Sequence, residues 1–334
     1  MTDTSSATPI TPQPPPPADE TAAPHSPREL VTHVGRGLGT LTPRPRVSRP
    51  LIQELRHALT ARDWWVLGAL AEHRVLTTVQ IARLAFDTDS AARHRMHTLH
   101  GLRAVDRFRP QTPVGSAPWH YVLDKAGAIL LAERHGIALS EVPYRADDAI
   151  HLAFSRQLAH TVAVNDFFTT LAAAARHLPG AELELWWPER RCARAWGSLV
   201  KPDGYGVWRH YSTQVGFFAE IDLGTEPLDA LVRKVAAYSR LAHTTGINTP
   251  VLFYLPGPRR EYGLHQVLND NARQVNGGGG ARVLVATAIH RSGTDLAGPI
   301  WLPVGSDGTR LPLAQLPTAA SILTTPCAQE WPQP

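Results

Sequence analysis

Four charged residues between positions 201 and 238 have types and spacing that suit chemistry on a phosphodiester. Asp203, Glu220 and Asp222 supply carboxylate oxygens, and Lys234 supplies an ammonium group. Carboxylate oxygens bind hard divalent cations such as Mg²⁺ or Mn²⁺, and such an ion stabilises the charge that develops on an attacked phosphodiester. We therefore predict a catalytic site in which Asp203 and Glu220 hold the metal. Asp222 would add a further or supporting oxygen, and Lys234 would orient water or phosphate.

Two strands and one helix would have to position these residues. Residues 200–207 and 214–222 are typical of two strands joined by a polar turn, and residues 228–242 are typical of a helix. On that helix, Lys234 and Tyr238 are four residues apart and share one face. We expect this face to point back at the two strands.

The alternation of side chains along a strand decides which groups can meet. Glu220 and Asp222 are two residues apart and share a face, as do Lys201 and Asp203 on the preceding strand. If the strands pair, those two faces lie together. An acidic pair such as Glu220 and Asp222 is also typical of a solvated strand end, so the rest of the chain has to support the prediction.

Composition indicates a cytoplasmic protein of two domains. The chain has 334 residues, a net charge of +4, no run of eighteen apolar residues and a polar, Pro-rich beginning. Its two cysteines, Cys192 and Cys327, are too few and too far apart for a zinc ribbon or a disulfide framework. We expect no membrane partner. The modest positive charge permits nucleic acid as a partner but does not require it.

The N-terminal half is typical of a disordered tail followed by a winged helix-turn-helix domain. Eleven of the 29 prolines fall within the first 50 residues, which lack apolar clusters. Three short helices follow, one of them opened by a capping box of Thr77 and Gln80. Two strands around the loop 109–118, and a helix capped by Asp124, complete the order of a winged helix.

The third of these helices has a basic face beside a core stripe of Ala92, Met96 and Leu99. In a winged helix this helix enters the major groove of duplex DNA, and the hairpin touches the backbone or the minor groove. A winged helix used for protein contacts remains the alternative. The predicted DNA contacts are Arg83, Arg93, Arg95, His97, Arg107 and Arg109.

The second half predicts a helix, three strands, a helix, a strand, a helix and a strand. The first helix would run from 151 to 178, and the first strand from 182 to 194. We interpret His151 and His160 on that helix as surface or core histidines, not metal ligands. The expected boundaries are 1–50 for the tail, 51–136 for the winged helix, 137–149 for a linker, 150–301 for the second domain and 302–334 for a Pro-rich tail.

The order of these elements, with Pro202-Asp203 and the Glu220-x-Asp222 pair, resembles the PD-(D/E)XK restriction-endonuclease-like fold, an α+β or α/β arrangement. More specifically, the sequence resembles the actinobacterial replication-relaxation family of plasmids and mobile elements, roughly from Arg62 to Ala288. The segments that carry this resemblance are RDWWVLGALAEHRVLTTVQIARLAF, GSAPWHYVLDKAG, HTVAVNDFF, WWPERR, KPDGYG and FFAEIDLGTEPLDALVRKVAAY.

The resemblance to the nuclease fold matches Asp203 to the aspartate of the motif and Glu220 to its second acid. Where the motif has lysine, this chain has Asp222. Some relatives of the fold carry that lysine on the following helix, which makes Lys234 the first candidate and Lys201 the second. The segment KVAAY is similar to the helix motif of RecB-like members.

Two functions from different classes remain open. The first is a metal-dependent DNA endonuclease, with Mg²⁺ or Mn²⁺ as cofactor, in plasmid replication or relaxation. The second is a DNA-binding accessory or transcriptional regulator whose nuclease fold is degenerate. The expected partners are double-stranded DNA, plasmid replication or transfer proteins and a second copy of the chain. No two histidines are two residues apart, which argues against a HUH relaxase, and no phosphate-binding P-loop motif is present.

Overall fold

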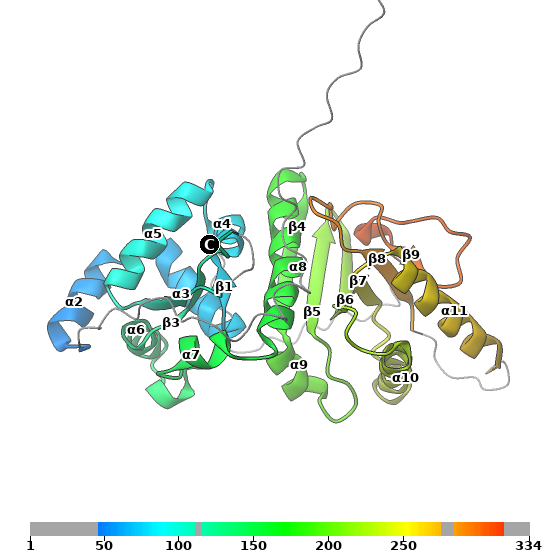
Figure 1. Cartoon of the computed structure of the whole chain (residues 1–334), viewed down its shortest axis with the longest axis horizontal. Helices are drawn as coiled ribbons and strands as arrows, with labels where there is room; N and C mark the ends of the chain where they lie inside the picture. The colour runs from blue at the N-terminus through cyan, green and yellow to red at the C-terminus, as the bar shows by residue number, and fades with distance from the viewer. Residues whose placement is uncertain (1–45, 111–114, 275–282, 317–334) are drawn as a thin grey trace, which may run out of the picture.

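The computed structural model describes residues 46–110, 115–274 and 283–316, and it is a mixed α/β structure built on two sheets (Figure 1). Several sequence predictions concern residues outside these ranges. They are the first 45 residues of the tail, the tip of the loop at 111–114, the Gly277–Gly280 segment and the end of the C-terminal tail. No helix in the described part of the chain is long and apolar enough to cross a membrane.

The first sheet has three short antiparallel strands in the order β1-β3-β2, surrounded by helices. The elements in chain order are α2 (Arg49–Ala58), α3 (Ala61–His73), β1 (Leu76–Thr77), α4 (Thr78–Ala85), α5 (Asp89–Gly101), β2 (Val105–Phe108), β3 (His120–Leu123) and α6 (Lys125–His135). Their apolar side chains form one core that includes Leu67, Met96 and Leu131.

Local sequence signals explain where these helices begin and end. The capping box of Thr77 and Gln80 is confirmed, since each side chain accepts a hydrogen bond from the other residue's backbone N–H. Thr88 caps α5, and Asp124 caps α6, as its position indicated. The helix α6 ends at Gly136, whose φ of 63° suits a residue without a side chain.

The helix predicted for residues 151–178 is instead two helices. They are α7 (Asp148–Ala153) and α8 (Leu158–His177), preceded by the short turn η1 (Leu139–Glu141). Between them, the Ser155 hydroxyl accepts a hydrogen bond from the backbone N–H of Gln157. A serine that bonds nearby backbone competes with helical hydrogen bonds, and this accounts for the break.

The second sheet has six strands in the order β4-β5-β6-β7-β8-β9. The pairs β4/β5, β5/β6 and β8/β9 are antiparallel, and β6/β7 and β7/β8 are parallel. The elements are β4 (Ala181–Pro188), α9 (Glu189–Trp196), β5 (Gly204–His210), β6 (Thr213–Ile221), α10 (Leu228–Thr245), β7 (Val251–Leu255), α11 (Pro258–Gln274), β8 (Val285–Ile289), β9 (Leu302–Pro303) and the turn η2 (Leu313–Gln315).

The strand predicted from 182 to 194 was too long. It ends at Pro188, and the basic segment that follows is the helix α9. Proline has no backbone N–H to continue a strand ladder, but it suits the start of a helix. Cys192 and Trp196, four residues apart on α9, are both buried, so the segment pairs an apolar stripe with its arginines.

The second sheet lies between two helical layers (Figure 1). On one face, Phe167 and Phe168 of α8 pack against Phe217 of β6. On the other face, α9, α10 and α11 cover a core that includes Phe218 and Phe253. The sheet also continues past residue 301, where the sequence indicated a tail, because β9 pairs with β8 and Leu313 is fully buried.

The helix α8 also joins the two sheets. The Gln80 side chain of α4 donates to the carbonyl of Val162, and Asn165 donates to the carbonyl of Val75 at 2.6 Å. Near the end of α8, Arg176 donates to the carbonyl of Phe86 between α4 and α5. The helix therefore packs against the second sheet and holds the α4–α5 turn in place.

Candidate active site at the end of the second sheet

The carboxylates predicted for the site come together where β5 begins and β6 ends. Gly204 of β5 pairs with Ala219 of β6 in the antiparallel register. Asp203, just before β5, and Glu220, the next residue of β6, therefore lie beside this pair. The strand β5 begins at Gly204, four residues later than predicted, and Pro202 supplies no N–H for pairing before it. All three carboxylates are buried, with exposed fractions of 8% for Asp203 and Asp222 and 1% for Glu220.

Two residues of α10 hold the Glu220 carboxylate. Lys234 Nζ lies 2.8 Å from one oxygen, and the Tyr238 hydroxyl donates to the other at 2.5 Å. The four-residue spacing of Lys234 and Tyr238 places both side chains on the face of α10 that points back at β6, as the sequence predicted. Tyr238 is fully buried and packs on Phe218.

The pKa shifts of the two partners disagree about the charge of Glu220. Burial and the charge of Asp203 raise the pKa of Glu220, which favours a neutral acid. Burial lowers the pKa of Lys234, but the charges of Glu220 and Asp203 outweigh it and raise that pKa, which requires an ionised Glu220. Both carboxylate oxygens accept hydrogen bonds from donors, an arrangement that a carboxylate satisfies fully and a protonated acid does not. We therefore treat Glu220 as ionised.

Asp203 is held by the first turn of α8 and by β6. One oxygen accepts from the backbone N–H of Ile221 at 2.7 Å and lies 3.2 Å from His160 Nε2. Burial alone would lower the pKa of His160, but the hydrogen bond and charge of Asp203 raise it to about 9, so the ring is a cation at neutral pH. Burial raises the pKa of Asp203, but the hydrogen bond and charge of His160, the charge of Lys234 and the backbone N–H of Ile221 together lower it.

Asp222 has its own cation, from a third helix. The Arg260 guanidinium of α11 donates to Asp222 at 2.5 Å and to the backbone carbonyl of Glu226. The other Asp222 oxygen accepts from the N–H of Gly224. The Asp222 carboxylate is therefore paired within the protein itself. Lys201, the second candidate for the missing lysine, is exposed.

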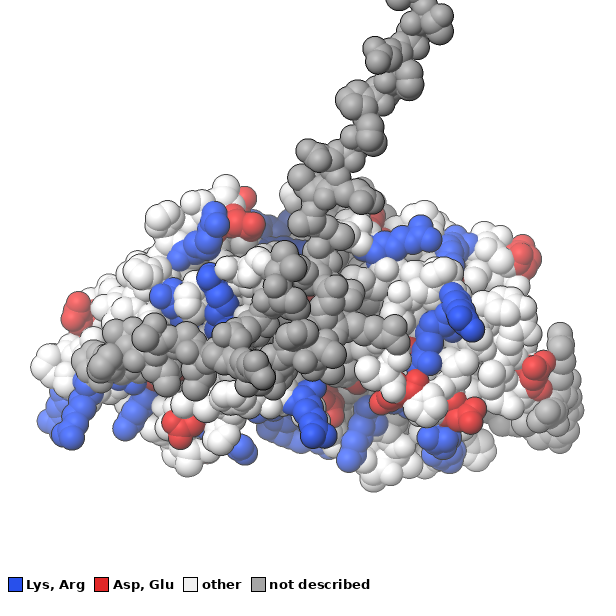
Figure 2. Space-filling view, viewed as in Figure 1, with Lys and Arg blue, Asp and Glu red and all other residues white. Residues whose placement is uncertain are grey.

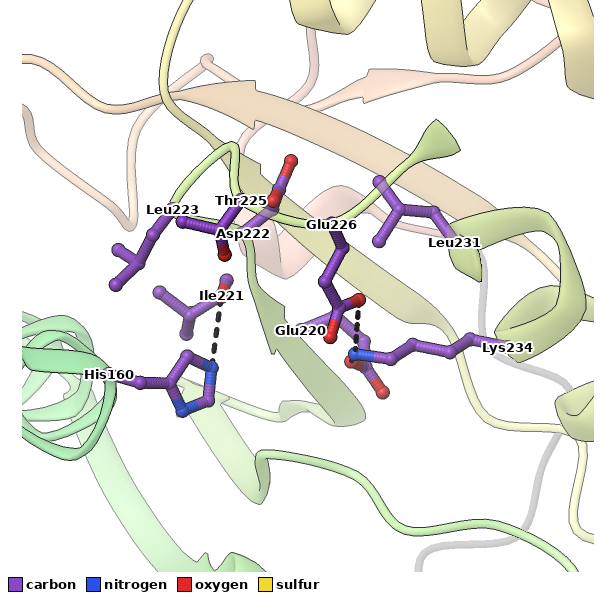
Figure 3. Close-up of a pocket in the computed structure, with 9 residues that line it drawn as sticks. All are labelled: His160, Glu220, Ile221, Asp222, Leu223, Thr225, Glu226, Leu231 and Lys234. Carbon is purple, nitrogen blue, oxygen red and sulfur yellow. Dashed lines mark hydrogen bonds and ion pairs between the residues drawn. The ribbon is translucent and has the colours of Figure 1, made fainter. Parts of the chain in front are cut away.

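A cavity opens over this cluster, with about 290 Å³ of space that includes open solvent. Figure 3 shows His160 entering from one side and Lys234 from the other, with Glu220 and Glu226 beside the ammonium group. The polar side chains that line it are His160, Glu220, Asp222, Thr225, Glu226 and Lys234. Asp203 does not line the cavity, but its partner His160 does.

The fit of a divalent cation can be judged from the donor atoms. Within the described ranges, no three side chains of His, Cys, Asp or Glu are grouped as metal ligands. However, His160 Nε2 lies within 3.2 Å of an Asp203 oxygen and 3.1 Å from the carbonyl oxygen of Ile221. Mg²⁺ prefers oxygen ligands, and a protonated His160 cannot bind a metal, so these atoms would fit one only after His160 lost its proton. Glu220 would complete the set only by releasing Lys234.

The six predicted DNA contacts fall into three groups, of which the first two lie on α4 and α5. On α5, Arg93 and His97 are exposed. By contrast, Arg95 pairs with the buried Asp63 at 2.5 Å and donates to the carbonyl of Ala58. Arg83 on α4 pairs with Asp166 of α8 at 2.5 Å. These two arginines hold helices of the chain itself together.

The two arginines of the hairpin share one aromatic partner. The guanidinium carbons of Arg107 and Arg109 lie 4.2 and 4.3 Å from the ring centroid of the half-buried Trp119. The backbone carbonyl of Trp119 accepts from Thr78, the first residue of α4. Cation–π contacts of this kind order the arginines and leave their charge exposed.

Sequence reasoning missed two members of the site. His160 was interpreted as a surface or core histidine, but the structure places it against Asp203. Arg260 was not singled out at all. The only local signal for His160 is its position in the first turn of α8. That position does not predict a contact with a carboxylate 43 residues away in the sequence.

The fold and the site define a mixed α/β protein with a buried, charge-paired acidic site at one end of a six-stranded sheet. The chain belongs to the replication-relaxation family, whose model matches residues 67–253, more than half of its length. This span contains His160, Asp203, Glu220 and Lys234 and ends before Arg260. Membership indicates a role in plasmid or mobile-element replication or relaxation. A search of curated proteins and a search of solved structures each found no match.

Proposed function

We propose that this protein binds double-stranded DNA during the replication or relaxation of a plasmid or mobile element. Residues 51–136 would form a winged helix-turn-helix domain that binds DNA, and residues 137–149 would link it to a nuclease-like domain that begins near 150. The second domain would extend to residue 316, because β9 and η2 pack on its sheet.

The observation that carries this proposal is the placement of α5. It follows α4 through a short turn, packs Ala92, Met96 and Leu99 into the core and exposes Arg93 and His97 on its outer side. An exposed basic helix after a tight turn, with an antiparallel hairpin beside it, is the arrangement by which winged helices read the major groove. Arg107 and Arg109 on the hairpin would contact the DNA backbone.

DNA binding can be tested by fluorescence anisotropy with a short labelled duplex over a range of salt concentrations. We expect the Kd to rise several-fold in Arg93→Ala and further in Arg93→Ala/His97→Ala. Arg240→Ala, which removes an exposed arginine from α10, is the matched control and should leave the Kd close to wild type. Equal affinity of the α5 variants and the control would exclude α5 as the DNA-contacting helix.

A metal-dependent DNA endonuclease is the second candidate, and one specific observation favours it. Asp203, Glu220 and Lys234, which the nuclease motif requires in one place, lie together at the sheet end although they come from three elements. When bound, Mg²⁺ or Mn²⁺ would stabilise negative charge on the attacked phosphate. Asp203 and Glu220 would hold it once each had given up its protein cation, and Lys234, released from Glu220, would orient water or phosphate.

The non-catalytic alternative also has an observation in its favour. Each of the three carboxylates already has a cation, which is His160 for Asp203, Lys234 for Glu220 and Arg260 for Asp222. In a cluster balanced in this way, no carboxylate depends on a metal for a charge partner. The second domain would then serve as a scaffold for protein contacts in a DNA-binding accessory or regulator.

A plasmid gel separates the two candidates. Supercoiled and linear plasmid would be incubated with the protein in Mg²⁺, Mn²⁺ or EDTA, beside Asp203→Asn/Glu220→Gln, which keeps the shape of both side chains. Metal-dependent nicking or cutting that the double variant lacks would support a nuclease. DNA that is bound by both proteins and cut by neither would support the accessory.

A further inference from the structure

Four arginines form a cluster where the end of α3 meets α9, and the site described above does not use them. They are Arg74, Arg190, Arg191 and Arg194, and we call them the arginine cluster. Arg190 donates to the backbone carbonyls of Ala71 and Glu72 in the last turn of α3, at 3.2 Å each. This contact fastens α9, which belongs to the second sheet, to a helix of the first.

The members of the cluster are close together and carry excess positive charge. Arg190 and Arg194 are four residues apart on α9 and share a face. Burial lowers the pKa of Arg190, the charge of Glu72 opposes this, and the charges of Arg194 and Arg74 lower it further, as expected for crowded cations. Glu72 lies 3.7 Å from Arg190 and offsets one of the four charges.

The cluster borders the acidic site. Pro188, the residue before α9, pairs with Gly204, which directly follows Asp203. On the inner side of α9, Cys192 is fully buried, and its pKa is raised by burial and also by the charge of Asp203. The outer side of the same helix carries the exposed Arg194. Figure 2 shows Lys and Arg side chains gathered along the lower edge of the molecule, in the region where Figure 1 places α9.

The backbone of Arg74 has a positive φ, a conformation that favours glycine. Its φ is 67° and its ψ is −46°, at the end of α3 where glycine is preferred. Its side chain is exposed, and within residues 46–110, 115–274 and 283–316 it forms no hydrogen bond or ion pair that would offset this strain. The exposed Arg74 adds its charge to the surface beside α9.

We propose that the arginine cluster binds the phosphate backbone of duplex DNA beside the acidic site. This inference rests on the proposed DNA binding and adds a second contact surface to it. Guanidinium groups match phosphate geometry and are more weakly hydrated than ammonium groups, which suits a surface that follows a sugar-phosphate backbone. Because α9 begins beside the strand end that carries Asp203, DNA held there would lie near the acidic site.

The salt dependence of DNA binding tests this surface directly. Each phosphate contact contributes about 0.9 to the slope of log K against log salt. We expect Arg194→Ala and Arg74→Gly each to reduce the slope by about 1 and to weaken binding several-fold, equally for duplexes of different sequence. Arg240→Ala is the matched control for the loss of one exposed helical arginine. Arg74→Gly should also raise the Tm, because glycine adopts a positive φ without strain. Weaker DNA binding by this variant would therefore not be caused by unfolding.

The outcomes separate the two proposals. If wild-type protein binds DNA and both variants keep its slope, the arginine cluster is not a DNA surface, while DNA binding by the chain stands. If Arg240→Ala lowers the slope as much as Arg194→Ala, the effect is one of overall charge and the cluster is again excluded. If wild-type protein shows no salt-dependent binding to the duplex, both proposals fail.

Discussion

Lys234 Nζ lies 2.8 Å from Glu220. Lys234 is on α10 and Glu220 is on β6, the strand that precedes this helix in the chain. Glu220 is 1% exposed, so its charge depends on Lys234 and on the Tyr238 hydroxyl. Removal of the cation would leave a buried carboxylate with one donor. This pair is therefore both the stabilising contact of the sheet end and the centre of the candidate site.

Lys234→Met keeps the length of the side chain and removes its charge. We expect the free energy of unfolding to fall by about 1–3 kcal/mol, less than for a fully buried pair because the lysine is partly exposed. Urea denaturation of the single and double variants checks this. Adding Glu220→Gln should recover part of the loss, because the unpaired charge is then gone. A loss that is purely additive would show that the two side chains are not coupled.

We predict that His73 makes the protein sensitive to acid. Its ring is buried and stacks on Trp186 with centroids 3.5 Å apart, and burial, with the charges of Arg190 and Arg191, lowers its pKa from 6.5 to about 3. The unfolded chain therefore takes up this proton first as the pH falls below 6.5, and stability declines until the folded form is protonated near pH 3.

The matched variant for this effect is His73→Phe, which keeps a ring on Trp186 and cannot be protonated. Between pH 7 and pH 4.5, wild-type protein should lose about 2 kcal/mol more of its unfolding free energy than the variant. Chemical denaturation at the two pH values measures the difference. Parallel losses in both proteins would mean that other groups control the acid response.

Arg93 and Arg95 are two residues apart on α5, but they should behave differently. Arg95 pairs with Asp63, which is buried, so Arg95→Ala should lower the unfolding free energy by about 1–3 kcal/mol. Arg93 is exposed, and Arg93→Ala should change stability by no more than about 0.5 kcal/mol. Thermal unfolding beside the DNA-binding assay tests both. If Arg95→Ala is as stable as wild type but binds DNA more weakly, Arg95 contacts DNA, as the sequence predicted.

Gly206 is confined by aromatic side chains next to the site. A Cβ atom there would lie 2.4 Å from Phe217 and 3.0 Å from Phe168, so Gly206→Ala should cost about 1–3 kcal/mol. Gly101→Ala is the control, since a Cβ there meets nothing within 4 Å. Urea denaturation should show the first variant destabilised and the second unchanged or slightly more stable, because alanine favours helix. Equal stability would mean that the sheet can shift to accept the methyl group.

The sequence by itself determined most of the elements and one half of the site. Capping residues such as Thr77 and Asp124 act within a few positions of the helices they start, and Lys234 and Tyr238 share a face because of helical period alone. Alternation along β6 likewise placed Glu220 on the side of the sheet that α10 covers. These signals are local, so one sequence carries them.

Only the tertiary structure decided which cation meets which carboxylate. His160 and Arg260 reach Asp203 and Asp222 from helices 43 and 38 residues away in sequence, and no spacing rule connects them. The same is true of Arg95, whose charge indicated DNA until the packing of α3 against α5 brought it to Asp63. Long-range ion pairs depend on how helices pack on sheets, and the periodicity of one segment does not contain that information.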